Sequence, residues 1–240
     1  MPLRVPGSSV TIHTGNLQNY AELPKPQRKL SSSMKFSDEL PAAINYLAQH
    51  GTLSTENGRV YSPHTAVFQK TSGDVKRVLK VWPTSMSPAS VQDAVHIALE
   101  TLHLKSLAEL IVSFPLTESM NLTDSEWMQQ TQPVWAAVES LVDSGAVRGV
   151  GVSDLEFKRF RLLCQEAKRH KPTAYHYSFD TMISCEVPPE LFVYAETNHI
   201  HLFTHDDPKR WSFDADIFND EFTDSTNFTA SKMDLRFLFN

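Results

Sequence analysis

The sequence predicts an α/β fold built on a parallel sheet, because strand-like segments alternate with helix-like segments. Four consecutive strand–helix units run from Arg77 to Thr204, and such alternation occurs in doubly wound sheets and in β/α barrels. No G-x-G-x-x-G motif follows the first of these strands, so a Rossmann-type cofactor site has no support. We therefore favour a (β/α)8 TIM barrel. The chain has 240 residues, a full barrel takes about 250, and we expect this barrel to be incomplete at the C-terminus.

The clearest evidence for this fold is the segment from Val134 to Asp154. It begins with apolar residues at helical spacing, and a glycine at Gly145 then ends the helix, since glycine accepts the left-handed conformation found there. Residues Ala146–Val152 are short, small and apolar, as in a strand buried on both faces. Ser153 has Glu156 three residues later, which matches an S-x-x-E capping box, so we expect Ser153 to cap the next helix.

The other elements follow from caps, prolines and periodicity. In the first part of the chain we expect a strand at 10–13, a linker at 23–36, a helix from Ser37 to about His50 and a strand at 65–69. Next we expect a strand at 77–82 closed by Pro83, a helix capped by Ser87 or Ser90, and a strand at 107–114 closed by Pro115. A loop at 116–132 then leads to the central helix, which we expect Pro133 to open. After the central segment we expect a helix to about His170, a strand at 173–179, a helix from Pro188–Pro189 to about Asn198 and a strand at 199–204.

The same reading divides the chain into three parts. Residues 1–36 form an N-terminal segment and linker, and residues 37–210 form the barrel domain. Residues 211–240 form a divergent tail, because they are polar, rich in Asp and Asn, and only weakly periodic.

Composition excludes several classes of function. The net charge is −6, with 22 basic and 28 acidic residues, so nothing supports a nucleic-acid or membrane partner. No apolar run approaches the roughly 20 residues of a membrane span, and the N-terminus lacks the core of a signal peptide. Two cysteines without a CxxC motif indicate a reducing compartment and no structural zinc. We expect a cytoplasmic protein.

Four motifs occur in a characteristic order: Lys80–Pro83, Glu109–Pro115, Trp135–Glu139 and Gly149–Asp154. In this order they resemble the aldo-keto reductases. The resemblance implies a β/α barrel and, in the active members, NADPH-dependent carbonyl reduction.

Further motifs are similar to one non-enzymatic branch of that family, the regulatory (modifier) subunits of glutamate–cysteine ligase. They are Thr14–Leu17, Gly151–Leu155, Val187–Leu191 and Leu202–Pro208. Asp154 matches that branch, whereas the reductases usually have Asn there. The resemblance implies a heterodimer with the ligase catalytic subunit, whose glutamate affinity and glutathione feedback are tuned in glutathione biosynthesis.

The catalytic set of the reductases is largely missing. A tyrosine acts as the proton donor to the developing alkoxide only when a nearby cation lowers its pKa. Lys80 matches the family's lysine, but Ser113 stands at the histidine position and His176 at that of a cofactor-binding glutamine. The Asp-Thr-Ala-x-x-Tyr motif is absent, with Tyr61 the only tyrosine in the region, and 205–240 has no basic segment for a 2′-phosphate.

We therefore assign no catalytic residue and no cofactor, with a vestigial NADPH site left open. The ancestral site would lie at the C-terminal ends of the strands, at Lys80, Ser113, Ser153, Asp154, His176 and His205. An active NADPH-dependent reductase with a rearranged site is the alternative function, and a truncated gene product is a third reading.

Several of these residues also have simpler interpretations. Lys80 fits an ordinary strand-end lysine, and helix capping explains Ser153 better than contact with a nicotinamide amide. A strand would direct three histidines to the same face, His199, His201 and His205, and such a group could bind a metal ion. We favour the simpler interpretation that these histidines are exposed or hydrogen-bonded.

The remaining assignments concern the cysteines and a basic run. Cys164 is expected in a helix core and Cys185 in a loop, where a silent thiol is favoured over a redox-responsive one. Residues 168–171 are expected to form a solvated helix end.

Overall fold

The structure is a computed structural model, and it describes residues 11–13, 52–54, 59–61, 76–83, 85–115, 121–178, 188–205 and 235–239. The chain divides into two units, which are described separately. The first contains Met1–Ser72 and Asp206–Ser231, and the second contains Gly73–His205 and Lys232–Asn240. The division at residues 36 and 210 expected from the sequence stays a prediction.

The first unit contains a small sheet of three strands, β1 (Thr11–His13), β2 (Thr52–Ser54) and β3 (Arg59–Tyr61). Strand β3 is central, with β1 parallel and β2 antiparallel to it. Only β1 was expected from the sequence. The helix expected from Ser37 and the strand expected at 65–69 lie outside the described residues.

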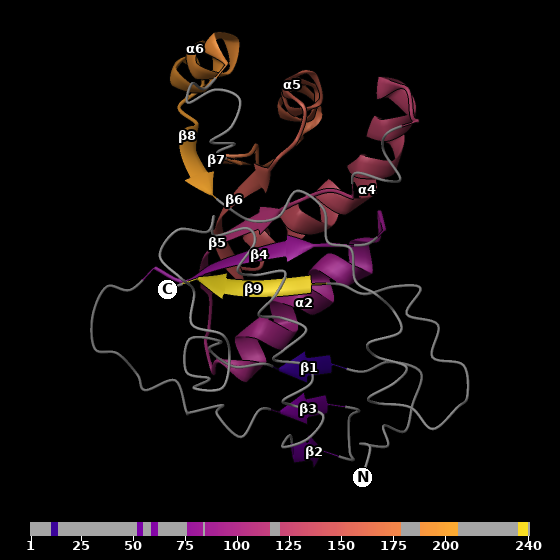
Figure 1. The fold of residues 1–240 in the computed structure, drawn as a ribbon, viewed down its shortest axis with the longest axis vertical. Helices are drawn as coiled ribbons and strands as arrows, with labels where there is room; N and C mark the ends of the chain where they lie inside the picture. Colours follow the sequence, from indigo (N-terminus) through magenta and orange to yellow (C-terminus); the bar gives the residue numbers. More distant parts are fainter. Residues whose placement is uncertain are drawn as a thin grey trace, which may run out of the picture. The chain divides into compact units, whose positions relative to one another are not determined.

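The second unit is a parallel sheet in which strands alternate with helices (Figure 1). The elements are β4 (Val78–Trp82), α2 (Pro88–Thr101), β5 (Leu107–Val112), α4 (Asp124–Asp143), β6 (Val147–Ser153), α5 (Phe157–Glu166), β7 (Ala174–Ser178), α6 (Pro189–Thr197), β8 (His201–His205) and β9 (Leu235–Phe239). The sheet order is β8-β7-β6-β5-β4-β9, in which β4 to β8 are parallel and β9 is antiparallel to β4.

The order of strands distinguishes the two architectures that the sequence left open. Strands β4 to β8 are neighbours in the order of the chain, whereas a doubly wound sheet reverses its order at a switch point. The helices also form one layer, since α2 contacts α4, α4 contacts α5, and Phe157 of α5 lies against Tyr194 of α6. The predicted α/β fold is therefore confirmed, and these five strands have the arrangement of an arc of a TIM barrel of the aldo-keto reductase type.

The two faces of the sheet differ in their contents. Leu79 and Val81 point toward the helices and are buried in one core with Val91 and Val95 of α2. Side chains alternate along a strand, so Lys80 lies on the other face, which we call the inner face. Burial of the apolar helix-side core stabilises the fold by about 25 cal/mol for each Å² removed from water.

Helix α4 begins nine residues earlier than the sequence analysis placed it. Thr123 is the N-cap, and its hydroxyl and the Glu126 carboxylate make a reciprocal capping box. Pro133 therefore lies inside the helix rather than at its start. The T-D-S-E sequence was present in the segment predicted as a loop, and burial of Trp127 and Thr131 holds the first half of the helix against the core. At the other end Gly145 has φ +74°, as expected for the residue after a helix.

The basic run at 168–171 is not a solvated helix end, because α5 ends at Glu166. The buried carboxylate of Glu139 on α4 accepts the backbone N–H groups of Arg169 and His170 at 2.7 and 3.2 Å. The Arg169 guanidinium also pairs with Glu139 and Asp143. These contacts fasten the segment after α5 onto α4. The helical periodicity placed Glu139 in a helix, but no local pattern indicated its distant partners.

Candidate functional site

Four of the six positions predicted for an ancestral site end or directly follow a parallel strand, and the other two, Lys80 and His176, lie in the middle of theirs. Lys80 is in β4, Ser113 follows β5, Ser153 ends β6 with Asp154 after it, His176 is in β7 and His205 ends β8. The backbone register places Ser153 beside His176, and His176 beside Phe203. Parallel strands bring these ends to one edge of the sheet.

Ser153, Asp154 and His205 form a compact cluster of hydrogen bonds. The Ser153 hydroxyl donates to Oδ2 of Asp154 at 3.0 Å and lies 3.1 Å from Nε2 of His205. Nε2 of His205 lies 3.0 and 3.1 Å from the two oxygens of Asp154. All three side chains are largely buried, with exposed fractions of 2% for the Ser153 residue and 9% and 17% for the His205 and Asp154 side chains. The cluster joins β6 to β8 across the strand between them.

The backbone positions Asp154 for these contacts. Its φ of +53° lies in the left-handed region, which Asp and Asn accept more readily than most residues. The Asp154 N–H donates to the His176 carbonyl, and Oδ1 accepts the N–H of Ser178, both at 2.9 Å. Asp154 is thus bound to β7 through its backbone and its side chain.

The charge balance favours an ionised Asp154. Burial raises the pKa of this carboxyl group. Three neighbours lower it: His205 by its hydrogen bond and positive charge, Lys80 by its charge, and Ser153 by its hydrogen bond. Together they outweigh burial, so the pKa of Asp154 lies below its ordinary value. Lys80 is itself 1% exposed, and its Nζ lies 4.9 Å from the ring centre of Trp82 on the same face.

The remaining two positions are less closely joined to this cluster. The His176 ring lies 5.1 Å from the ring of Phe203 and 6.5 Å from that of His205, measured between centroids. Ser113 is buried beside β4, where its N–H donates to Val81, and within the described residues its hydroxyl makes no hydrogen bond to the other five positions. His176 faces away from the helix-side core that contains Tyr175, since neighbouring side chains in a strand point to opposite faces.

The prediction that Ser153 caps the following helix is wrong. Ser153 is the last residue of β6, and α5 begins at Phe157 after Glu156, whose side chain makes no capping hydrogen bond. The S-x-x-E pattern matched by chance, because the strand extends one residue further and turns the Ser153 hydroxyl toward Asp154 and His205. Trp82 beside Lys80 was also missed, although its spacing of two residues in a strand indicates a shared face.

This arrangement does not make Ser153 a nucleophile. In a serine–histidine–aspartate triad the imidazole uses one nitrogen for serine and the other for aspartate. Here the same nitrogen, Nε2 of His205, faces both Ser153 and Asp154, and Ser153 is buried. The cluster therefore connects strand ends and does not activate a hydroxyl group.

The cluster also does not fit the nicotinamide amide that the resemblance would place at Ser153 and Asp154. An amide needs a free acceptor for its NH₂ group and a free donor for its carbonyl. Both Asp154 oxygens already accept hydrogen bonds, and the Ser153 hydroxyl already donates to Asp154. These described residues are therefore engaged with one another where the reductases would hold the cofactor amide.

The other candidate groups have the following positions. Within the described ranges no set of three His, Cys, Asp or Glu side chains is arranged to hold a metal ion, and His199 precedes β8 with φ +55°. Tyr61 is in β3 of the first unit, and Cys185 lies outside the described residues. Cys164 is buried in the helix-side core, and burial raises the pKa of its thiol to about 11. None of the helices in the described part of the chain is long and apolar enough to cross a membrane.

Comparison with known proteins identifies the class to which this fold belongs. The model of the aldo/keto reductase family matches residues 46–206, and the chain belongs to this family. Within it, the chain is homologous to the regulatory subunits of glutamate–cysteine ligase. It is 27% identical to that subunit from Rattus norvegicus over 213 residues, which are 84% of this chain and 74% of the rat protein.

Two further matches come from reductases. The chain is 31% identical over 94 residues to aldo-keto reductase family 4 member C11 from Arabidopsis thaliana, covering 37% of this chain and 30% of the plant protein. Among solved structures, it matches MGS-M4, an aldo-keto reductase from a Medee basin deep-sea metagenome library, with a TM-score of 0.43 and 19% identity. That match covers 53% of this chain and 42% of the other.

Proposed function

We propose that this chain is a non-catalytic regulatory subunit that binds the catalytic subunit of glutamate–cysteine ligase. The main support for this proposal is the similarity to a glutamate–cysteine ligase regulatory subunit over 84% of the chain. The Ser153–Asp154–His205 cluster supports the same proposal, because its polar atoms are engaged with one another at the place where a reductase would bind its cofactor amide.

In this proposal the protein acts by allosteric coupling in a cytoplasmic heterodimer. Binding raises the affinity of the catalytic subunit for glutamate and weakens feedback by glutathione, and glutamate in turn strengthens the complex by the same coupling free energy. A tenfold change in affinity corresponds to about 1.4 kcal/mol. No cofactor takes part in this mechanism. The vestigial site positions in this proposal are Lys80, Ser113, Ser153, Asp154, His176 and His205.

The test combines binding with steady-state kinetics. The purified chain is mixed with the purified catalytic subunit of the same organism, and sedimentation velocity reports whether a complex forms. The KM for glutamate is then measured with the chain, without it, and with an inert protein of similar mass. A complex with a lowered KM supports the proposal, and absence of a complex at micromolar concentrations contradicts it.

An NADPH-dependent reductase is the second candidate, and one observation favours it. The sequence resemblance assigns Lys80 to the family's lysine, and Lys80 is buried on the inner face, with its charge acting on Asp154. A reductase would bind NADPH saturably and oxidise it with a carbonyl substrate. Titration of NADPH fluorescence against the chain tests this candidate: our proposal predicts no saturable binding in the micromolar range.

A further inference from the structure

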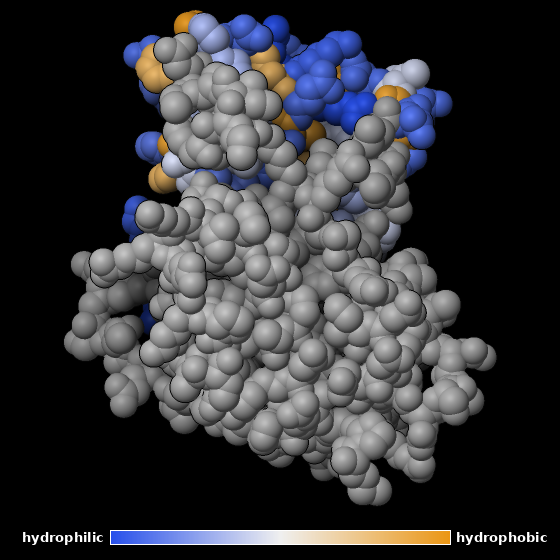
Figure 2. Space-filling view, viewed as in Figure 1, coloured by the Kyte–Doolittle hydropathy of each residue, from blue (hydrophilic) through white to orange (hydrophobic). Residues whose placement is uncertain are grey.

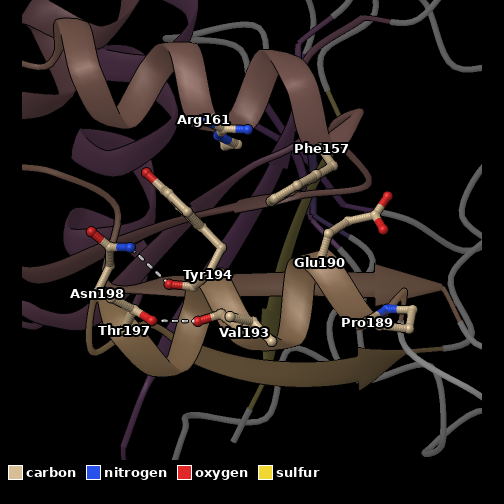
Figure 3. A pocket seen from close by; sticks show the side chains of 8 residues that line it. All are labelled: Phe157, Arg161, Pro189, Glu190, Val193, Tyr194, Thr197 and Asn198. Carbon is tan, nitrogen blue, oxygen red and sulfur yellow. Dashed lines mark hydrogen bonds between the residues drawn. The ribbon is translucent and has the colours of Figure 1, made fainter.

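A surface groove lies between helices α5 and α6 (Figure 3). Its volume is about 440 Å³. The aromatic rings of Phe157 and Tyr194 line it and meet edge to face, with 5.7 Å between their centroids. The groove is lined by Phe157, Arg161, Pro189, Glu190, Val193, Tyr194, Thr197 and Asn198.

The side of the groove formed by α6 is unusually apolar for a surface helix. Val193, which lines the groove, is 60% exposed, and its neighbour Phe192 is 54% exposed. Figure 2 shows hydrophobic residues among hydrophilic ones on the surface that α5 and α6 form. Adjacent exposed apolar side chains beside a hollow are typical of a surface that another protein covers.

The charged side chains that line the groove are Arg161 of α5 and Glu190 of α6, and Arg161 is placed to select the partner. The guanidinium carbon of Arg161 lies 5.8 Å from the ring centres of both Phe157 and Tyr194. The neighbouring bases on α5, Lys158 and Arg159, pair with Asp124 of α4. In the part of the chain that the structure describes, Arg161 has no carboxylate partner, so its exposed charge is available to an acidic group brought by another molecule.

We propose that the groove between α5 and α6 is where the ligase catalytic subunit docks, through an apolar segment that carries an acidic residue. The segment would cover Val193 and Tyr194, and its carboxylate would pair with Arg161. Grooves between helices accept apolar segments in this way, and Tyr and Arg are enriched among the residues that dominate binding energy. This inference rests on the proposed function and assigns its docking surface.

Three variants and one control test the assignment. Val193→Asp places a charge against the apolar segment, and Arg161→Glu opposes the acidic residue, so each should raise the Kd for the catalytic subunit by at least about tenfold. Arg161→Lys keeps the charge and should stay within about threefold of the wild type. Gln130→Asp adds a charge at an exposed position of α4, away from the groove, and should change the Kd by less than about twofold.

The outcomes separate the docking surface from the proposed function. Circular dichroism first checks that each variant is folded. We expect the variants to fold, because the substituted side chains are exposed. Normal binding by folded Val193→Asp and Arg161→Glu overturns the docking surface while leaving the regulatory function intact. If the wild-type chain itself fails to bind, the proposed function has failed. A homodimer that Val193→Asp dissociates, with catalytic-subunit binding unchanged, would show that a second copy fills the groove and would also overturn the assignment.

Discussion

Nε2 of His205 lies 3.0 Å from Oδ2 of Asp154, and this contact joins the ends of β8 and β6 across β7. Oδ1 of the same carboxylate accepts the N–H of Ser178 in β7. One side chain thus ties together three neighbouring strand ends. An Asn at this position would keep one acceptor oxygen and lose the charge.

Asp154→Asn should destabilise the fold near neutral pH by about 2 kcal/mol, the contribution of hydrogen bonds to a charged group. The pKa of Asp154 is lowered in the folded protein, so its stabilising effect is present above the unfolded pKa of about 3.9 and is lost as the pH falls through the folded pKa. Urea unfolding of both proteins between pH 7 and pH 3 measures the difference. A difference that grows as the pH falls would contradict this account.

Gly151→Ala should be poorly tolerated because β6 and β7 approach closely at this position. A Cβ atom there would lie 2.6 Å from the Ala174 carbonyl oxygen and 2.7 Å from Cδ1 of Ile111. We expect a loss of about 1–3 kcal/mol, as for overpacked cores. Gly149→Ala is the matched control, since its nearest neighbour would be 3.5 Å away. Equal unfolding midpoints for the two variants would refute the close approach.

Glu139→Ala should release the segment after α5 from α4. Burial raises the pKa of Glu139, but the N–H groups of Arg169 and His170 and the Arg169 guanidinium outweigh burial and lower it. Removal of the carboxylate leaves two part-buried N–H groups without their acceptor and should cost about 1–3 kcal/mol. Asp143→Asn, at an exposed ion pair, should cost less than about 1 kcal/mol. Faster hydrogen exchange at 169–170 in the Glu139 variant alone is the expected signature.

Cys164 should be chemically silent in the folded protein. Burial raises the pKa of its thiol to about 11, and the thiolate is the reactive form. Alkylation by iodoacetamide at pH 8 should therefore be at least about a hundredfold slower than in urea. Peptide mapping by mass spectrometry measures the two rates separately for each cysteine. Comparable labelling of Cys164 with and without urea would show that it is accessible.

The sequence predicted the periodic parts of the fold well. The four strand–helix units were found because β4 to β8 and their helices each carry a local pattern of apolar residues. Strand β9 was missed, since Leu235–Phe239 follows a polar, weakly periodic region and pairs with β4 from far away in the chain. The start of α4 was misplaced because Pro133 suggested a helix start more strongly than the capping box at Thr123.

The site was predictable in position but not in its contacts. The rule that barrel sites lie at strand C-termini selected six positions, and three of them, Ser153, Asp154 and His205, are in direct contact. The direction of the Ser153 hydroxyl was not predictable, because capping and clustering use the same residue types. The groove at Arg161 and Tyr194 was missed, since its residues come from two helices and have no shared motif.

The most direct test of the central claim is a titration of the ligase catalytic subunit with this chain, at a fixed, subsaturating glutamate concentration. The regulatory account predicts that the rate rises saturably, with a midpoint equal to the Kd measured by sedimentation. It also predicts that the titration leaves the maximal effect unchanged when NADPH is added. A complex that forms while the glutamate dependence stays the same would contradict the account.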